Sequence, residues 1–395
     1  MKLEGIRVVD LSRFLPGPML TQHMADHGAE VIKVEATDEG EPTRVIGETR
    51  DGVSVFFANT SRGKKSLALN LKHRDGVEAF LRLVETADVV VEAFRPGVAE
   101  RLGVGYAQVA ARAPRVVYVS ISAFGQTGPY RNIATHDLAT EAMAGTLSIT
   151  CGRDGAPVIP GLPAGDMLSS ALGLSGVLMA LLRRERTGRG DFLDIAMAES
   201  LLSSMPNNMG SAMAERRQPI LSESRSLGGN ALYALYETAE GGWIALGSQE
   251  AKFAVRILTM LGRPDLIEAC LLPPGRGHDP VRDFLKATFL TRTREQWIAF
   301  FAGHDVPIAP VKTLPEVLDD PHFRARGMVT TNSKGWDQIG SPICFGDEPG
   351  APSDTLPNQG EHTREILHNI GYSAAEIAVL EAAGTVRCLP NEGEA

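Results

Sequence analysis

The stretch IRVVDLSRFLPGPMLTQHMADHGAEVIKVE, residues 6–35, contains two runs of branched apolar residues with a helical segment between them. Ile6–Leu11 and Glu30–Glu35 have the composition of short buried strands. Between them, Pro18 opens a segment that stops at Gly28, which is the usual placement of proline at a helix start and of glycine past its end. The stretch therefore predicts a strand, a helix and a second strand.

The same alternation continues to about residue 200. Further strands are expected at residues 66–71, 88–94, 116–124 and 191–197, and Val77, Phe80, Leu81 and Val84 repeat at the spacing of a surface helix. Short strands separated by helices favour an α/β fold with a mostly parallel sheet and helices on both faces.

In such sheets ligands bind at the carboxyl ends of the strands. The loops concerned are those after Leu11, Glu35, Phe94 and Phe124. We therefore expect the functional site to be built from these loops.

From about Leu227 the pattern of expected elements changes, which predicts a second domain. Ala231–Thr238 and Trp243–Gly247 have the pattern of a strand pair, and helices follow to about Gly303. The chain has 395 residues, whereas a single core stops growing at roughly 250–300 residues. Two short helices are expected near the end of the chain, at residues 362–367 and 374–383.

Composition excludes several classes of protein. With 43% hydrophobic and 22% charged residues, the chain is not of the disordered class. Its net charge of −9 argues against a nucleic-acid binder, which needs Lys and Arg in excess. The 4 cysteines, at positions 151, 270, 344 and 388, lack the spacing of a metal site or the density of a disulfide framework.

No secretory signal or membrane span is expected. The uncharged stretch Met167–Leu182 is shorter than the about 20 residues that a span requires, so it favours a buried core helix. The first residues lack a basic segment followed by an apolar run. These features predict a soluble, cytoplasmic protein with no nucleic-acid or membrane partner.

The familiar sequence signatures of nucleotide, hydrolase and zinc sites are absent. No GxGxxG follows the first strand, and the chain has no GxxxxGK[ST], GxSxG, HExxH or CxxC. The sequence therefore gives no indication of a phosphate-cradling glycine loop or of a bound metal.

A local excess of positive charge lies between Thr60 and Asp75. Its members are Arg62, Lys64, Lys65, Lys72 and Arg74. They fit a solvated edge that protects an exposed strand, and they fit equally well a patch that pairs with ligand phosphates. Arg95, at a strand's carboxyl end, and Arg101, in the next helix, are a second candidate anion clamp.

Asp166 lies where the segment GLPAGDM leads into the long apolar helix. At an expected N-cap, its carboxylate would satisfy an orphan N–H group, which is a common structural role. The positive helix end would also keep it ionised and available as a nucleophile. His136, in a His-Asp pair that heads a helix, and Glu250, after the strand pair, are further candidates, although each has an ordinary structural or surface interpretation.

Taken together, these segments resemble the class III CoA-transferases of the CaiB/BaiF type. The matching stretches include VVDLSRFLPGPMLTQHMADHGAEVIKVE, SRGKKSLALNLK, VVVEAFRPGVAERLGVGY, HDLATEAMAG, IPGLPAGDM and HDVPIAPVKTLPEVLDDPHFRARGM. They are in order and span nearly the whole chain.

The resemblance implies a discontinuous fold. A Rossmann-like large domain would comprise residues 1–225 and 329–395, a smaller α+β domain would comprise residues 226–328, and two chains would interlock as a homodimer. It also implies coenzyme A or acyl-CoA as substrate, a small carboxylic acid as the other reactant, no permanently bound cofactor and no metal.

The resemblance assigns CoA contacts residue by residue. Phe14 would line the nucleotide pocket, and Lys72 and Arg101 would hold phosphates. Arg95 is added as a cofactor-binding candidate from its place at the end of a strand. Other contact positions of the family fall on Ala36, Ala93 and Ala134, where this chain departs from the best-known members.

The resemblance also makes Asp166 the nucleophile of a formyl-CoA transferase-like reaction, in which an aspartyl-CoA thioester forms. The same family includes alpha-methylacyl-CoA racemases, which move a proton at the carbon beside the thioester with a His, an Asp and a Glu. His136, Asp166 and Glu250 occupy those places here. Met-Leu-Ser-Ser after Asp166, where racemases tend to have glycines, favours the transferase.

Overall fold

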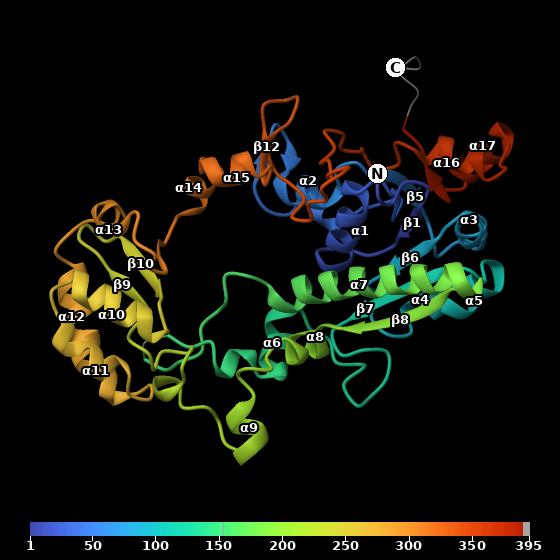
Figure 1. Ribbon diagram of the computed structural model, residues 1–395. Helices are drawn as coiled ribbons and strands as arrows, with labels where there is room; N and C mark the ends of the chain where they lie inside the picture. Colours follow the sequence, from blue (N-terminus) through green and yellow to red (C-terminus); the bar gives the residue numbers. More distant parts are fainter. Residues whose placement is uncertain (153, 390–395) are drawn as a thin grey trace. The chain divides into compact units, whose positions relative to one another are not determined.

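The computed structural model describes residues 1–152 and 154–389, which divide into two compact units (Figure 1). The first unit comprises residues 1–152, 158–204 and 321–389, and the second comprises residues 154–157 and 205–320. The expected domain boundaries at 225/226 and 328/329 stay a prediction, and the last six residues of the expected large domain lie outside the described residues.

A seven-stranded sheet forms the centre of the first unit, in the order β14-β5-β2-β1-β6-β7-β8. Its strands are β1 (Arg7–Asp10), β2 (Glu30–Glu35), β5 (Lys65–Leu69), β6 (Val89–Glu92), β7 (Val117–Ser122), β8 (Asp191–Ala196) and β14 (Val386–Arg387). All neighbours pair in parallel except β14, which runs antiparallel to β5. The mostly parallel α/β sheet is thus confirmed, and its strands β2 and β5 to β8 lie where the sequence predicted them.

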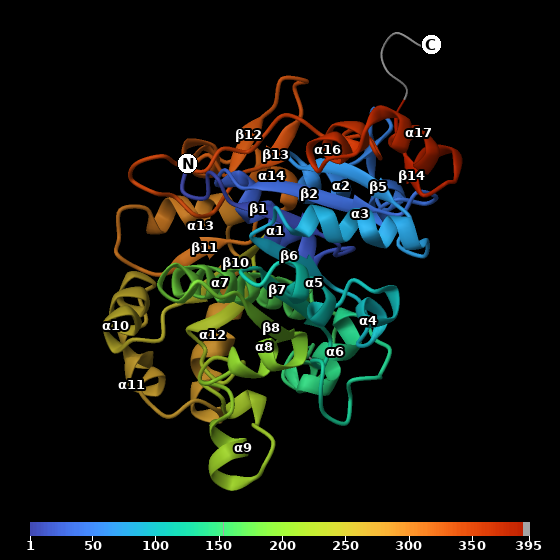
Figure 2. The ribbon, with the colours of Figure 1, turned by 90° about the vertical axis from the view of Figure 1, so that its right-hand side faces the viewer.

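Both faces of this sheet are covered, because alternate residues of each strand point to opposite sides. Val8 and Val31 belong to an apolar cluster with α1 (Pro16–Asp26) and α7 (Ala164–Thr187). Val9 and Ile32, the next residues, belong to a cluster with α3 (Arg74–Val84), α5 (Tyr106–Arg112), α16 (Thr363–Asn369) and α17 (Ala374–Ala382). Figure 2 shows α16, α17 and β14 beside β5, so the end of the chain completes a sheet that its beginning starts.

The remaining elements of the first unit are short. They are β3 (Thr49–Arg50), β4 (Val53–Ser54), α2 (Val55–Ser61), α4 (Val98–Leu102), α6 (Asp137–Ala144), α8 (Met197–Ser203), α15 (Pro321–Ala325), β12 (Val329–Thr331) and β13 (Asp337–Ile339). Of these, α4 and α6 follow β6 and β7, so they begin near the carboxyl edge of the sheet.

Helix α7 is only half buried. Gly173, Val177 and Leu181 face the sheet, and Figure 1 shows the helix along β7 and β8. By length and composition alone α7 could cross a membrane, and 44% of its apolar window is buried. The prediction of a buried core helix is confirmed for one face only, because Leu172, Met179 and Leu182 are exposed.

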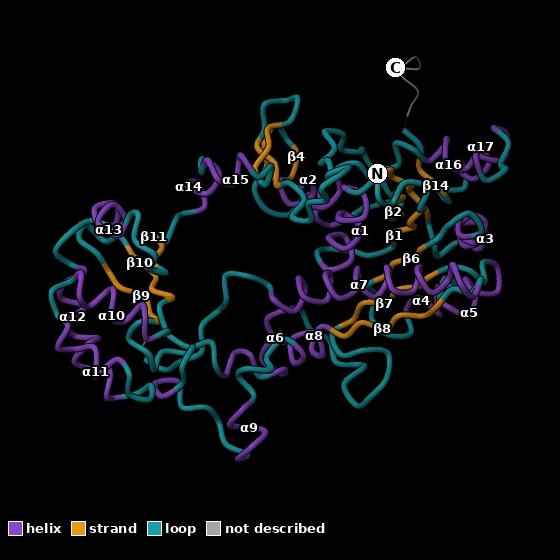
Figure 3. The backbone as a smooth tube through the Cα atoms, viewed as in Figure 1, coloured by secondary structure: helices purple, strands orange, loops and turns teal. Residues whose placement is uncertain are grey.

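The second unit has a three-stranded antiparallel sheet, β11-β10-β9. Its elements are α9 (Gly210–Glu215), β9 (Tyr233–Glu237), β10 (Trp243–Gly247), α10 (Ala251–Met260), α11 (Ile267–Cys270), α12 (Asp279–Phe289), α13 (Arg294–Phe301), β11 (Ile308–Pro310) and α14 (Leu314–Leu318). Figure 3 shows α10, α11 and α12 on one side of β9 and β10. The predicted strand pair is present, and Trp297, whose indole N–H donates to the Phe289 carbonyl at 2.8 Å, lies at the centre of the core.

Candidate active site

A cavity of about 400 Å³ opens at the carboxyl ends of β1, β2, β5 and β6. Leu11, Glu35 and Phe94 line it, so three of the four loops singled out from the sequence meet here, whereas the loop after Phe124 does not contribute. The cavity forms because parallel strands all end at one edge of the sheet and their following loops diverge.

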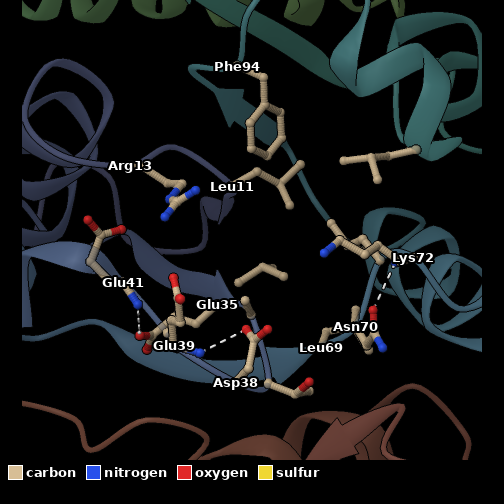
Figure 4. Close-up of a pocket in the computed structure, with 16 residues that line it drawn as sticks. Leu11, Arg13, Glu35, Asp38, Glu39, Glu41, Leu69, Asn70, Lys72 and Phe94 are labelled. Carbon is tan, nitrogen blue, oxygen red and sulfur yellow. Dashed lines mark hydrogen bonds between the residues drawn. The ribbon is translucent and has the colours of Figure 1, made fainter.

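The cavity carries charge of both signs (Figure 4). Arg13 and Lys72 extend into it from opposite sides, and Asp38 and Glu39 lie along another edge. Ala36, one of the positions at which this chain departs from the resembling family, also lines it. Lys72 is thus the member of the basic stretch that the structure brings to the cavity.

The other basic residues next to β5 have structural partners, and for these residues neither interpretation of the stretch holds. The buried Arg62 pairs with Asp26 at 2.7 Å, and the buried Lys64 pairs with Asp10 at 3.2 Å. Lys65 is shared between acidic side chains of β2 and α16. These three side chains neither form a phosphate patch nor protect a free edge, because β14 already pairs with β5.

Arg95 and Arg101 follow β6, the first in the loop and the second within α4. Both are exposed, and neither has an ion-pair partner within residues 1–152 and 154–389. Phe94 and Leu102, their sequence neighbours, line the cavity. The two arginines therefore lie beside the cavity with free guanidinium groups, and their contact with a ligand stays a prediction.

A cluster of three carboxylic acids surrounds the start of α7. The helix begins at Ala164 after Pro163, which offers no side-chain cap. Instead, Glu141 accepts the N–H of Ala164 at 3.2 Å, and Asp137 accepts the N–H of Asp166 at 2.9 Å. The expected N-cap role of Asp166 is therefore wrong, because its carboxylate lies within the first turn and α6 supplies the caps.

The protonation of Asp166 also differs from the sequence-based expectation. Burial, followed by the nearby charges of Asp137 and Glu141, raises the pKa of Asp166 to about 7. Burial and hydrogen bonding with Asp137 likewise raise the pKa of Glu141. The positive end of the helix dipole does not keep Asp166 fully ionised, since two carboxylates already occupy that end.

His136 directly precedes α6, and its ring meets the edge of Phe14 with ring centroids 6.1 Å apart. Phe14 lies in the loop after β1 with a left-handed backbone, φ 65°. The start of α6 thus brings Asp137 to Asp166, while the preceding His136 has Phe14 beside it.

Glu250 belongs to the second unit. It directly precedes α10, forms an ion pair with Lys252 at 3.1 Å and is exposed. Its association with Asp166 stays a prediction.

Sequence reasoning missed Glu141 as a member of this site and named Asp137 only as the neighbour of His136, without a role of its own. Both were present in the quoted stretch HDLATEAMAG, and their spacing of four residues places them on the same face of a helix. That spacing is the signal that could have found them, although only the fold reveals that this face meets the start of α7.

Comparison with known proteins finds similarity over nearly the whole chain. The model of CoA-transferase family III matches residues 3–363. A succinyl-CoA–D-citramalate CoA-transferase of Chloroflexus aurantiacus is 33% identical over 96% of this chain and 97% of its own length. An alpha-methylacyl-CoA racemase of Mus musculus is 34% identical over 97% of this chain and 97% of its own.

A crystal structure of a CaiB/BaiF family protein from Brucella suis is also similar. It aligns with a TM-score of 0.81 and 29% identity, over 93% of this chain and 99% of that protein. Because the family model matches residues 3–363 and relatives of 33–34% identity span nearly the whole chain, the chain belongs to CoA-transferase family III, whose relatives here include alpha-methylacyl-CoA racemases.

Proposed function

We propose that this protein transfers CoA from an acyl-CoA thioester to a carboxylic acid, with Asp166 as the nucleophile. The observation that carries the proposal is the environment of Asp166, which is partly buried beside Asp137 and Glu141 without a cationic partner among the described residues. Such an environment penalises the ionised carboxylate. A neutral covalent derivative of Asp166 escapes that penalty.

The chemistry runs in two symmetric halves. The Asp166 carboxylate attacks the thioester carbonyl carbon, the C–S bond breaks, and a mixed anhydride and CoA thiolate result. The thiolate attacks the Asp166 carbonyl carbon and releases the donor acid, which leaves an aspartyl-CoA thioester. An acceptor carboxylate then repeats both steps in reverse, yielding a new acyl-CoA and the free Asp166 carboxylate.

The remaining site residues take roles around this step. We assign the nucleotide end of CoA to the cavity of Figure 4, with Lys72 on its phosphates and Arg95 and Arg101 at its rim. We assign Phe14, whose ring contacts His136 and whose neighbour Arg13 lines the cavity, to the nucleotide pocket. His136 and Glu250 complete the reacting end.

Assembly and location are part of the same proposal. We infer a Rossmann-like large domain, a small domain between residues 226 and 328, and an interlocked homodimer. The exposed apolar face of α7, with Leu172, Met179 and Leu182, supports a second copy as partner. A cytoplasmic location without membrane or nucleic-acid partners is inferred from composition.

Alpha-proton transfer is the second candidate function. A pKa of about 7 suits a general acid and base near neutral pH, and the exposed His136 is a second proton carrier. In this reaction one group removes the α-proton to form an enolate and the other returns a proton to the opposite face. The similarity to a racemase supports this candidate.

One experiment separates the two functions. The protein is incubated with succinyl-CoA and other short acyl-CoAs, with and without candidate acids, and is analysed by mass spectrometry and by α-hydrogen exchange in deuterated water. We expect a CoA-sized adduct that hydroxylamine removes and that Asp166→Asn does not form. Exchange without any adduct, lost in His136→Ala, would establish proton transfer instead.

A further inference from the structure

A buried ion pair lies beneath the loop that carries Arg13 and Phe14. Lys33, in β2, and Glu41, after it, approach to 2.9 Å, and each side chain is 2% exposed. Buried charges are costly unless they are paired and hydrogen-bonded. This pair therefore needs an explanation that stability alone does not supply.

Both members of the pair hold the same loop. The Lys33 ammonium donates to the carbonyl of Ser12 at 2.6 Å, and Glu41 Oε1 accepts the N–H of Phe14 at 2.9 Å. The two hydrogen bonds fix the backbone on either side of Arg13. The loop is thus attached to β2 and to the segment after it, rather than only to its own strand.

The loop has a conformation that requires such support. Phe14 has φ 65°, in the left-handed region that a bulky residue rarely adopts. With this conformation, the Arg13 side chain extends into the strand-end cavity, while the Phe14 ring meets His136. The same loop therefore places Arg13 in the cavity and Phe14 against His136.

We propose that Lys33 and Glu41 are positioning residues of the acyl-CoA site, which fix the loop Ser12–Phe14 so that Arg13 faces the cavity and Phe14 faces His136. The inference rests on the proposed function for its link to CoA. The structural part of the proposal is that the Glu41 carboxylate beneath the loop accepts the N–H of Phe14, and this part does not depend on which reaction the protein catalyses.

A matched pair of double variants tests the proposal. Lys33→Met with Glu41→Gln removes the ion pair but keeps an oxygen that accepts the Phe14 N–H. Lys33→Met with Glu41→Leu removes the ion pair and the acceptor together. Both replace the charges by side chains of similar size, which buried pairs often tolerate. The difference between them reports the acceptor oxygen at position 41, which serves the N–H of Phe14 and the hydroxyl of Thr43, and exchange at the Phe14 amide separates the two bonds.

The readouts are hydrogen–deuterium exchange of the loop, the Kd of free CoA, and the KM and kcat for an acyl-CoA that the wild type turns over. For the Leu variant we expect fast exchange in the loop and a Kd and KM about tenfold above wild type, with a smaller change in kcat. The Gln variant should restore all three to within about twofold.

Equal behaviour of the two variants would overturn the proposal. If the Leu variant fails to fold, the Phe14 amide of ¹⁵N-phenylalanine-labelled wild type decides, because an amide that exchanges as fast as an open loop has no such bond. Failure of the proposed function is a separate outcome: free CoA binding and exchange would differ between the variants while no acyl-CoA is consumed.

Discussion

The pKa values of two buried carboxylates in the first unit are shifted in opposite directions. Asp10, at the end of β1, is fully buried, yet Lys33 and Lys64 outweigh the effect of burial and lower its pKa to about 2. Asp166, at the start of α7, has carboxylates as neighbours, and its pKa rises to about 7. The first cluster is neutralised internally, whereas the second leaves its charge uncompensated.

The comparison shows how the charges of neighbouring groups set the pKa of a buried carboxylate. A compensated cluster fixes the backbone, as Asp10 does by accepting the N–H of Ser12 at 2.9 Å and the hydroxyl of Thr21 at 2.7 Å. An uncompensated one stores an unfavourable interaction that a reaction can relieve, and such perturbed groups concentrate at functional sites. Burial alone does not distinguish the two clusters, but the sign of the neighbours does.

The largest contrast should appear in activity. Asp166→Asn should reduce turnover of acyl-CoA by at least about 10³-fold, since it removes the proposed nucleophile, while the protein stays folded. Steady-state kinetics and circular dichroism measure the two quantities. Full activity of this variant would show that Asp166 is not the nucleophile, and that its raised pKa does not mark it as the reacting group.

Stability should show the reverse contrast. Asp10→Asn leaves the buried Lys64 without its carboxylate partner, and breaking a buried pair in this way costs about 3–5 kcal/mol. Urea denaturation measures the loss in the free energy of unfolding. A loss as small as that of an exposed control such as Asp283→Asn would show that the Asp10 cluster contributes little.

The pH dependence of stability sharpens the comparison further. Because the folded protein raises the pKa of Asp166 from 3.8 to about 7, the favourable contribution of its protonated form is complete below pH 4 and is lost as pH rises through 7. Asp166→Asn should therefore be more stable than wild type at pH 8, by about 2 kcal/mol after allowance for partial solvent screening. The difference should vanish near pH 4 in parallel thermal melts.

The smallest expected effect is on the pH–rate profile. Asp137→Asn keeps an oxygen for the N–H of Asp166 but removes a negative charge, so the pKa of Asp166 falls. For CoA transfer, which needs ionised Asp166, the rise of kcat/KM with pH should move down by about 1 pH unit. Glu141→Gln should act in the same direction, and an unchanged profile in both variants would show that these neighbours do not set the pKa.

Strands β6 and β7 of the large sheet could be predicted from the sequence because they are buried on both faces and rich in branched apolar residues. Glu30–Glu35 in the large sheet and Trp243–Gly247 in the sheet of the second unit have the predicted bounds. The two-residue strand β14 could not be found, since its strand character comes only from pairing with Leu69 and Ala68 in a distant segment.

The site residues named from the sequence stay a prediction, and the charges around them could not be predicted. Asp166 could be singled out because a glycine- and proline-containing segment leads to it at the start of a long apolar helix. Lys72 could be singled out because it lies in a stretch rich in lysine and arginine. The partners that decide their charges are distant in the sequence: Asp137 lies 29 residues from Asp166, and Asp10 lies 54 residues from Lys64. Local composition therefore suggested a basic patch next to β5 where the fold has neutral pairs.

The position of β14 has a consequence for the synthesis of the chain. Leu69 emerges from the ribosome long before its partner Val386, so β5 remains an open edge during most of translation. At about 5–20 residues per second, that interval is on the order of 15–60 seconds. An unpaired strand edge of this duration is a template for association between nascent chains, from which the finished protein is protected by β14.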